Sequence, residues 1–472
     1  MLFNSFPFIL FLIITFVVYY LPFNFIKKNQ VVVLILASFF FYAFQKPILL
    51  LLLIVSIIMN TYFSFNIHNV EKLKVKRSLL LGVIFNLAIL TFFKYSPLIS
   101  STLNKEFNLN NSFVDVLLTI PLPIGISFYT FEGISLLLDL YKGKTVMDME
   151  SGSFSTHLKR TAFFISFFPH LIAGPILKAR DFYPQINFKR FKDIRWEDAV
   201  KKLILGFFLK MVIADNLNNI THDIAFPFFQ GYSTANLVLL LFGYSMQIFA
   251  DFAGYSLIAI GLGALFGYNL PKNFDFPYIS ASFSEFWRRW HISLSTWLRD
   301  YLYIPLGGNK KGELRTYFNL FIVMFLGGLW HGASWSYAVW GSMHGFFLMM
   351  ERKFRKEKPA DGKRKPLAVF FVFFIVTTLW LLFKLTDFTH FLLYFKAMGQ
   401  NTRLPIKFGL DQLSILFFSL AVILYHLIYL RYQSSSGLEK KSPNLEVLLY
   451  SIMLFAIIVS SGPQGSFIYF QF

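Results

Sequence analysis

The chain has 472 residues, of which 56% are hydrophobic and 15% charged, and its formal net charge is +19. A soluble domain carries about 25% charged residues, and a soluble fold of this size has too little interior for so much apolar surface. The composition excludes a soluble globular protein, a coiled coil and a disordered chain, and predicts an all-α polytopic membrane protein. Because cysteine is absent, disulfides, thiolate metal sites and an acyl-cysteine intermediate are excluded as well.

Twelve apolar segments approach or reach the length needed to cross about 30 Å of hydrocarbon. They lie at residues 5–21, 31–44, 48–64, 79–97, 114–140, 203–222, 236–266, 317–333, 335–350, 367–385, 411–430 and 446–462. No basic region precedes the first segment, no small-residue cleavage site follows it, and Lys27 and Lys28 come after it, so we interpret it as an uncleaved span. Segment 161–177 is also apolar, but Pro169, Gly174 and Pro175 interrupt it, which favours a re-entrant element.

The positive charge follows this topology. With both termini outside, 36 of the 44 Lys and Arg residues fall in predicted inner loops and five in outer loops. Such a bias is typical of cytoplasmic loops, so the charge needs no nucleic-acid partner. We interpret the chain as a single membrane-embedded domain with N-terminal helices (1–160), a catalytic core (161–350) and C-terminal helices (351–472). No internal repeat is evident, which weakens the alternative of a transporter or lipid-linked sugar flippase.

Three regions place polar residues in apolar surroundings, where they are functional candidates. In the first, Gln247, Asp251 and Tyr255 recur every four residues and therefore share one stripe of a predicted span. The favoured interpretation is a hydrogen-bond cluster that joins helices. The alternative is a polar wall of a substrate tunnel.

The second region, 284–301, is predicted to form one amphipathic helix. Its aromatic face carries Trp287, Trp290, Leu294, Trp297 and Tyr301, and its cationic face carries Arg288, His291, Ser295 and Arg299. An interfacial helix on the inner leaflet explains the aromatic face. For the cationic face, contact with an anionic or phosphate-bearing donor is the functional alternative, because the arginine fork matches phosphate.

The third region, 326–335, places His331 deep in an apolar segment with glycines around it and Trp330 and Trp335 beside it. Glycines permit a break or a close backbone approach, and the tryptophans could enclose a narrow site. Histidine is the usual general base near neutral pH, and no cysteine competes for the role. A histidine that merely bonds a carbonyl is the structural alternative. His170 and His344 are further candidates for lining a cavity.

Four stretches carry a resemblance to a known family: residues 271–278, 286–295, 299–309 and 328–332. Weaker matches lie at 123–129, 174–175, 246–256 and 467–472. The chain resembles the membrane-bound O-acyltransferase family, and within it the bacterial branch similar to alginate O-acetyltransferases. The resemblance implies a ring of helices around a tunnel. It also implies that His331 corresponds to the family's catalytic histidine and His291 to its second functional histidine.

The resemblance further implies an acyl transfer from a cytoplasmic donor, acetyl-CoA, to an exported polysaccharide, with a partner of the SGNH-hydrolase-like type. Peptidoglycan O-acetylation and teichoic-acid D-alanylation are close alternatives. The expected location is the bacterial cytoplasmic membrane, with no metal and no tightly bound cofactor. The residues expected to bind donor or substrate are Gln247, Asp251, Tyr255, Asn273, Asp275, Trp287, Arg288, Ser295, Arg299, Asp300, Trp330 and Trp335.

Overall fold

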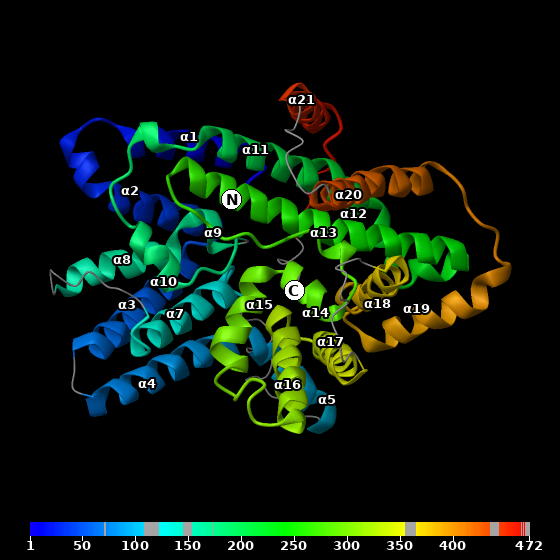
Figure 1. Ribbon diagram of the computed structural model, residues 1–472, viewed down its shortest axis with the longest axis horizontal. Helices are drawn as coiled ribbons and strands as arrows, with labels where there is room; N and C mark the ends of the chain where they lie inside the picture. The colour runs from blue at the N-terminus through cyan, green and yellow to red at the C-terminus, as the bar shows by residue number, and fades with distance from the viewer. Residues whose placement is uncertain are drawn as a thin grey trace. The chain divides into compact units, whose positions relative to one another are not determined.

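The structure is a computed structural model, and its regular secondary structure is helical throughout the residues that it describes (Figure 1). Those residues are 1–69, 72–107, 122–144, 153–172, 174–354, 365–434, 443–463, 465 and 467. The predicted all-α class is therefore confirmed over this part of the chain. The helices divide into two compact units, residues 1–202 with 258–271 and residues 203–257 with 272–472.

The first unit contains most of the N-terminal helices. They are α1 (Phe6–Tyr20), α2 (Asn24–Ala43), α3 (Ile48–Asn69), α4 (Lys72–Leu90), η1 (Thr91–Tyr95), α5 (Ser96–Phe107), α7 (Ile126–Tyr141), α8 (Phe154–Ser166), α9 (Phe168–Leu171), α10 (Ala179–Phe182), η2 (Tyr183–Gln185) and η3 (Phe191–Asp193). Within it, α3 and α4 are joined by reciprocal amide hydrogen bonds between Asn60 and Asn86, both fully buried. Gly133 of α7 lies so close that a Cβ there would stand 2.5 Å from the Asn60 side-chain oxygen.

The second unit contains most of the stretches that carry the resemblance, among them residues 286–295, 299–309 and 328–332. Its elements are η4 (Phe208–Ala214), α12 (Asp215–Thr221), η5 (His222–Ile224), η6 (Phe228–Gly231), η7 (Pro277–Ile279), α14 (Phe283–Arg289), α15 (Ile292–Leu298), η8 (Arg299–Tyr303), α16 (Glu313–His331), α17 (Trp335–Phe354), α18 (Pro366–Lys384), α19 (Phe388–Gln400), η9 (Asn401–Arg403), α20 (Leu410–Ser434) and α21 (Pro443–Val459). Two helices, α11 (Trp196–Phe207) and α13 (Thr234–Leu265), contribute residues to both units.

Each predicted span overlaps a helix, but residues 122–125, 332–333 and 460–462 of three spans are described and lie outside helices. Residues 114–121 of the fifth span lie outside the described residues. Seven described helical segments are long and apolar enough to cross a membrane. α1 and α21 are apolar but shorter. The protein is therefore a multi-pass membrane protein, and the count of twelve spans stays a prediction.

The segment predicted to be re-entrant is broken and buried. α8 ends at Ser166, Phe167 leaves the helical conformation, and α9 begins with Pro169 in its first turn, where a missing backbone N–H costs nothing. Its described residues, 161–172 and 174–177, are all buried within the first unit. The predicted break is confirmed, and its depth in a membrane stays a prediction.

Helix α19 was missed by the sequence analysis. Residues 386–410 were treated as an outer loop, yet α19 occupies residues 388–400. Asp387 caps it by accepting a hydrogen bond from the Thr389 backbone N–H, and the buried Tyr394 donates to the Leu237 carbonyl oxygen. A hydropathy search overlooks such a helix, because only one of its faces is apolar and it is too short to span.

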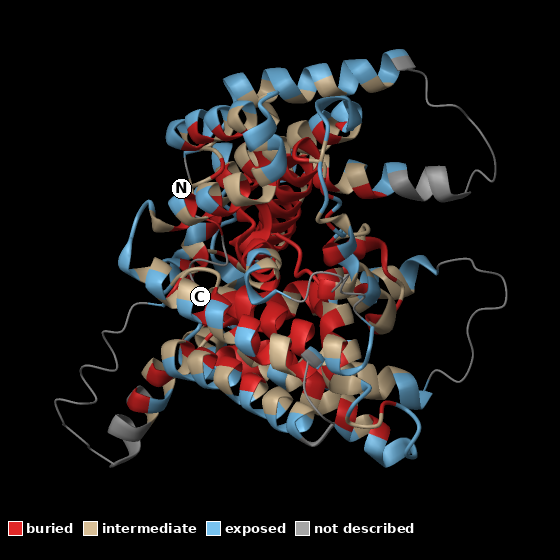
Figure 2. Cartoon of the chain, turned by 90° about the vertical axis from the view of Figure 1, so that its left-hand side faces the viewer, coloured by how far each residue is buried: buried red, intermediate tan, exposed pale blue. Residues whose placement is uncertain are grey.

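Large apolar side chains remain exposed on many of the helices. Figure 2 colours the exposed and the buried residues along each helix. On α1, Phe6, Ile9 and Ile13 are at least half exposed, and so are Phe455 and Ile458 on α21. In water such faces would drive association. In a bilayer they are the surfaces that contact lipid, which agrees with the composition.

Candidate active site

The region predicted as one amphipathic helix, 284–301, is broken at its centre. α14 ends at Arg289, Trp290 is extended, and His291 adopts a left-handed conformation with φ 42° and ψ 56° before α15 begins. A left-handed residue other than glycine costs about 1–2 kcal/mol, so the surrounding structure must hold it. The prediction of a continuous helix is therefore wrong.

Asn273 supplies the hydrogen bonds that hold this break. Its backbone oxygen accepts from the Ile292 N–H at 2.9 Å, and its side-chain oxygen accepts from the Ser293 N–H at 3.2 Å and the Ser293 hydroxyl at 2.6 Å. Two residues on, the Asp275 backbone N–H donates to the Arg289 carbonyl oxygen, and the Arg289 guanidinium donates to the Asp275 carbonyl oxygen and forms an ion pair of 3.3 Å with its carboxylate. Both Asn273 and Asp275, expected to bind the donor, therefore position the turn at His291.

The break also separates the residues of the predicted cationic face. His291 is fully buried, whereas Arg288 and Arg299 are exposed and bind Ser284 and Asp300 respectively. Ser295, the remaining member, donates its hydroxyl to the Trp290 carbonyl oxygen. The four residues do not form one cationic stripe, because the helical wheel assumed a regular turn where the chain bends. Contact between the two arginines and a donor stays a prediction.

His331 is the last residue of α16, and glycines set its position against α17. A Cβ on Gly328 would lie 2.2 Å from the Tyr337 carbonyl oxygen, and a Cβ on Gly332 would lie 2.2 Å from the Tyr337 ring. Only glycine permits this approach, since real Cβ atoms do not come so close. The expected close backbone approach is confirmed, and it fixes the α16–α17 hairpin around His331.

The two predicted histidines meet in one buried cluster. Their ring centroids are 6.2 Å apart, although His291 and His331 belong to separate motifs. Trp330 lies 5.8 Å from His291, and the rings of Trp340 and Phe383 lie 5.3 Å and 5.1 Å from His331. Burial lowers the pKa of His291 to about 3, so this imidazole is neutral at physiological pH. We call these five side chains the histidine cluster.

A third histidine extends the cluster on α17. His344 is fully buried with its ring 4.6 Å from Trp340 and 5.1 Å from Trp287. Neither of its ring nitrogens has a hydrogen-bond partner among the described residues. Trp340 was missed by the sequence analysis, although its spacing of four residues from His344 places both on one face of α17.

Trp335 does not enclose the site as expected. Its side chain is 57% exposed at the start of α17. Trp340, one and a half turns further along the helix, contacts His331 instead. The sequence placed the enclosing ring next to the motif, but the turn between α16 and α17 directs Trp335 outward.

The polar stripe on α13, formed by Gln247, Asp251 and Tyr255, joins helices, in agreement with the favoured interpretation. Asp251 and Asp215 each bind the Lys210 ammonium at 2.7 Å, and all three are buried. The Tyr255 ring lies 5.3 Å from the same ammonium, and Gln247 donates to the Asn218 side chain at 3.0 Å. These contacts connect α13 with η4 and α12, and we call Lys210, Asp215 and Asp251 the charged cluster. The alternative interpretation, that the stripe forms a polar wall of a substrate tunnel, stays a prediction.

A buried acid–histidine pair in the first unit was also missed. Glu132 of α7 and His170 of α9 are fully buried, and their side chains are 3.1 Å apart. The Leu177 backbone N–H donates to the same carboxylate. The sequence analysis missed the pair because Glu132 and His170 lie far apart in the chain, and no local spacing connects them. In the part of the chain that the structure describes, no three His, Asp or Glu residues group closely enough to hold a metal ion.

Comparison with known proteins assigns the chain to a family. The chain is 43% identical over 309 residues to a probable alginate O-acetylase, AlgI, of Pseudomonas putida, which covers 66% of this chain and 62% of the relative. It is 35% identical to a peptidoglycan O-acetyltransferase of Helicobacter pylori, over 73% of this chain and 69% of the relative. It is 32% identical to a teichoic acid D-alanyltransferase of Bacillus subtilis, over 49% of this chain and 60% of the relative.

The matched region spans about three fifths of the length of the alginate relatives. The model of the membrane-bound O-acyltransferase family matches residues 116–376, more than half of the chain and the part that holds both site histidines. The chain therefore belongs to the membrane-bound O-acyltransferase family.

Proposed function

We propose that this protein transfers an acyl group, in the first place acetyl, to hydroxyl groups of an extracytoplasmic polysaccharide. The observation that carries the proposal is the meeting of His291 and His331 in one buried cluster, with ring centroids 6.2 Å apart. In the proposed reaction His331 takes the proton from the acceptor hydroxyl as its oxygen attacks the acyl carbonyl. The thiol of the donor leaves, and the ester forms.

Because His291 is neutral, we assign different roles to the two histidines, with His331 as the general base and His291 as an orienting group. Because burial holds its pKa at about 3, His291 does not carry a proton as imidazolium at neutral pH. It would orient a reactant by a hydrogen bond. The rings of Trp330, Trp340 and Phe383 around His331 exclude water, which would otherwise hydrolyse the donor.

The histidine cluster also contains a hydrogen-bond donor that could stabilise an oxyanion. The indole N–H of Trp340 has no hydrogen-bond partner among the described residues, and its ring lies against His331. A preorganised donor of this kind would stabilise the negative charge that develops on the acyl oxygen. Trp340 takes this role in the proposal, and Trp335, which was expected to enclose the site, is exposed.

The proposed donor is acetyl-CoA on the cytoplasmic face, where the basic inner loops would attract its phosphates. The relatives' names include alginate, peptidoglycan and teichoic acid, and higher identity to the alginate relatives favours an exported polysaccharide as acceptor. An SGNH-hydrolase-like protein outside the membrane would complete the delivery. The proposal places the protein in a bacterial cytoplasmic membrane as one domain of about twelve spans around a tunnel, with residues 161–350 as its core and both termini extracytoplasmic.

Reconstitution tests the proposal. Proteoliposomes supplied with radiolabelled acetyl-CoA inside, and with alginate, peptidoglycan or teichoic acid outside, should transfer label to one polymer in the presence of an SGNH-type partner. His331→Ala should abolish transfer, whereas His222→Ala, at a largely exposed histidine, should leave it unchanged. Equal transfer by His331→Ala and the wild type would overturn the mechanism. If no acyl donor is consumed, the transferase class itself is wrong.

A further inference from the structure

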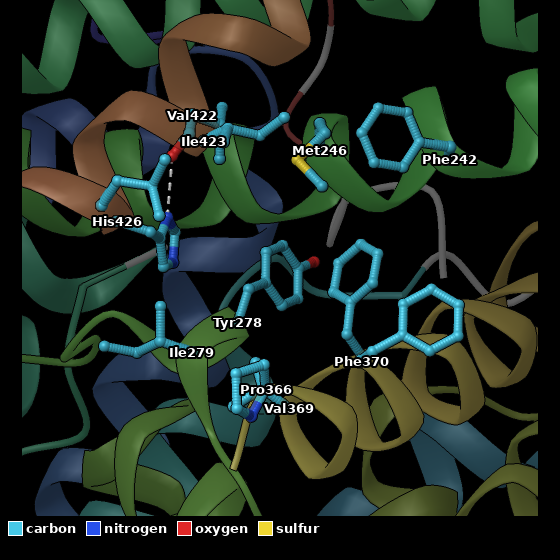
Figure 3. Close-up of a pocket in the computed structure, with 12 residues that line it drawn as sticks. Phe242, Met246, Tyr278, Ile279, Pro366, Val369, Phe370, Val422, Ile423 and His426 are labelled. Carbon is cyan, nitrogen blue, oxygen red and sulfur yellow. Dashed lines mark hydrogen bonds between the residues drawn. The ribbon is translucent and has the colours of Figure 1, made fainter. Parts of the chain in front are cut away.

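A pocket of about 450 Å³ lies in the second unit between α13, α18 and α20 (Figure 3). Twelve residues line it, among them Phe242, Met246, Val369, Phe370 and Val422. Tyr278 and His426 are the two lining residues whose side chains carry hydrogen-bonding groups. The pocket is thus an apolar space with polar atoms on one wall.

The polar group of Tyr278 is already satisfied. Its hydroxyl donates to the Ser245 carbonyl oxygen at 2.6 Å and accepts from the Ser245 hydroxyl at 3.2 Å. Its ring stacks on His426 with centroids 5.6 Å apart. Tyr278 therefore contributes a flat wall and leaves no donor for a ligand.

His426 presents one unused acceptor. Its Nδ1 lies 2.8 Å from the Val422 carbonyl oxygen, which can only accept, so Nδ1 carries the hydrogen. In the neutral ring Nε2 then holds a lone pair and accepts. His426 is 4% exposed, and Nε2 has no hydrogen-bond partner among the described residues. Figure 3 shows this nitrogen turned away from Val422, toward the space beside Tyr278 and Ile279.

The surroundings of the pocket point to a lipid as its occupant. Segments 366–384 and 410–428, which form two of its sides, are both candidate membrane spans. Phe370 and Leu427 line the pocket and are 64% and 51% exposed, so it opens on a surface that faces lipid in a bilayer. Water is scarce there, and a hydrogen-bond donor for Nε2 must come from a membrane amphiphile.

We propose that this pocket binds a lipid alcohol, with its apolar chain between α18 and α20 and its hydroxyl donating to Nε2 of His426. The chemistry is complementary, since ordinary acyl esters offer acceptors but no donor. The proposal is independent of the acyl-transfer reaction. Tyr278 lies 6.1 Å from Trp290, and Trp290 lies 4.8 Å from Trp380, so rings separate the pocket from the histidine cluster.

Photolabelling of the intact protein in phosphatidylcholine nanodiscs tests this site. The probes are a diazirine-bearing hexadecanol and its methyl ether, which differ only in the hydroxyl donor. The wild type should be labelled about fivefold more by the alcohol, the factor expected for one neutral hydrogen bond, and the label should map to α18 or α20. Equal labelling by the two probes would overturn the proposal.

Two variants separate the apolar part of the site from the polar part. Leu427→Trp should fill the pocket and lower labelling by both probes several-fold. The matched control is Leu424→Trp on the same helix, because Leu424 is 46% exposed but does not line the pocket. His426→Phe keeps a ring but loses the acceptor, so the preference for the alcohol should vanish while labelling by the ether persists.

A competition measurement uses only the wild type, so its result does not depend on whether a variant folds. Unlabelled hexadecanol should displace the photoprobe at about one fifth of the concentration that its methyl ether requires. Equal competition by the two compounds, or equal labelling of Leu427→Trp and Leu424→Trp, contradicts the assigned site.

Discussion

Two buried polar clusters in the second unit, the charged cluster and the histidine cluster, are stabilised in different ways. In the charged cluster, Lys210 is held by two carboxylates at 2.7 Å each. In the histidine cluster, two imidazoles lie among aromatic rings, and His291 stays uncharged because burial lowers its pKa. Burial of an ion requires a paired ion, whereas a neutral ring needs only contact. The ion pairs of the charged cluster therefore suit a stabilising role, and the ring-enclosed histidines are the groups to which the proposal assigns the chemistry.

The largest expected effect is the loss of activity at His331. His331→Ala removes the proposed general base and should lower acyl transfer by about a thousandfold, within the range that general-base catalysis contributes. Its unfolding temperature should stay close to that of the wild type, because no buried ion loses its partner. Both quantities can be measured on one purified preparation. A large fall in thermal stability with retained activity would reverse the roles assigned to the two clusters.

The charged cluster should give the opposite result. Lys210→Met leaves Asp215 and Asp251 buried without their cation and should cost about 3–5 kcal/mol of unfolding free energy. Transfer activity per folded molecule should change little. Lys201→Met is the matched control on the preceding helix, because Lys201 pairs with the exposed Glu197, and such pairs contribute about 0–1 kcal/mol. Similar losses in the two variants would contradict the comparison.

The close contact between α16 and α17 at Gly328 gives a further test of the histidine cluster. Gly328→Ala places a Cβ against the Tyr337 carbonyl oxygen and should cost about 1–3 kcal/mol as α16 and α17 move apart. Because His331 ends α16, activity should fall as well. Gly399→Ala on α19 is the control, since nothing lies within 4 Å of the Cβ that it adds. Thermal unfolding and transfer assays on both variants measure the difference.

The smallest expected effect is a pH dependence of stability. The pKa of His291 is about 3 in the folded protein and about 6.5 when unfolded, so the unfolded chain binds more protons between these values. Its stabilising contribution is complete above pH 6.5 and is lost as the pH falls toward 3. At pH 5.5 the loss is about 1.4 kcal/mol. His291→Phe should remove this part of the pH dependence, whereas His222→Phe should not.

Much of this architecture could be predicted from the sequence because it follows from composition and local spacing. The apolar runs predicted most of the long helices that the structure shows. The orientation inferred from the cation bias stays a prediction. Pro169 predicted the break between α8 and α9. The motifs also singled out His291 and His331, which share one cluster. The exceptions, α19 and the break at Trp290, arise where short helices carry a weak hydropathy signal.

The sequence by itself determined the class of protein, the family and the two candidate histidines, because composition and short motifs encode burial and local geometry. Tertiary structure alone decided which side chains meet them. The left-handed turn at His291 depends on Asn273, eighteen residues earlier, and the ring that contacts His331 is Trp340 rather than the nearer Trp335. A helical wheel cannot anticipate either result, because both depend on hydrogen bonds and packing between segments distant in the chain.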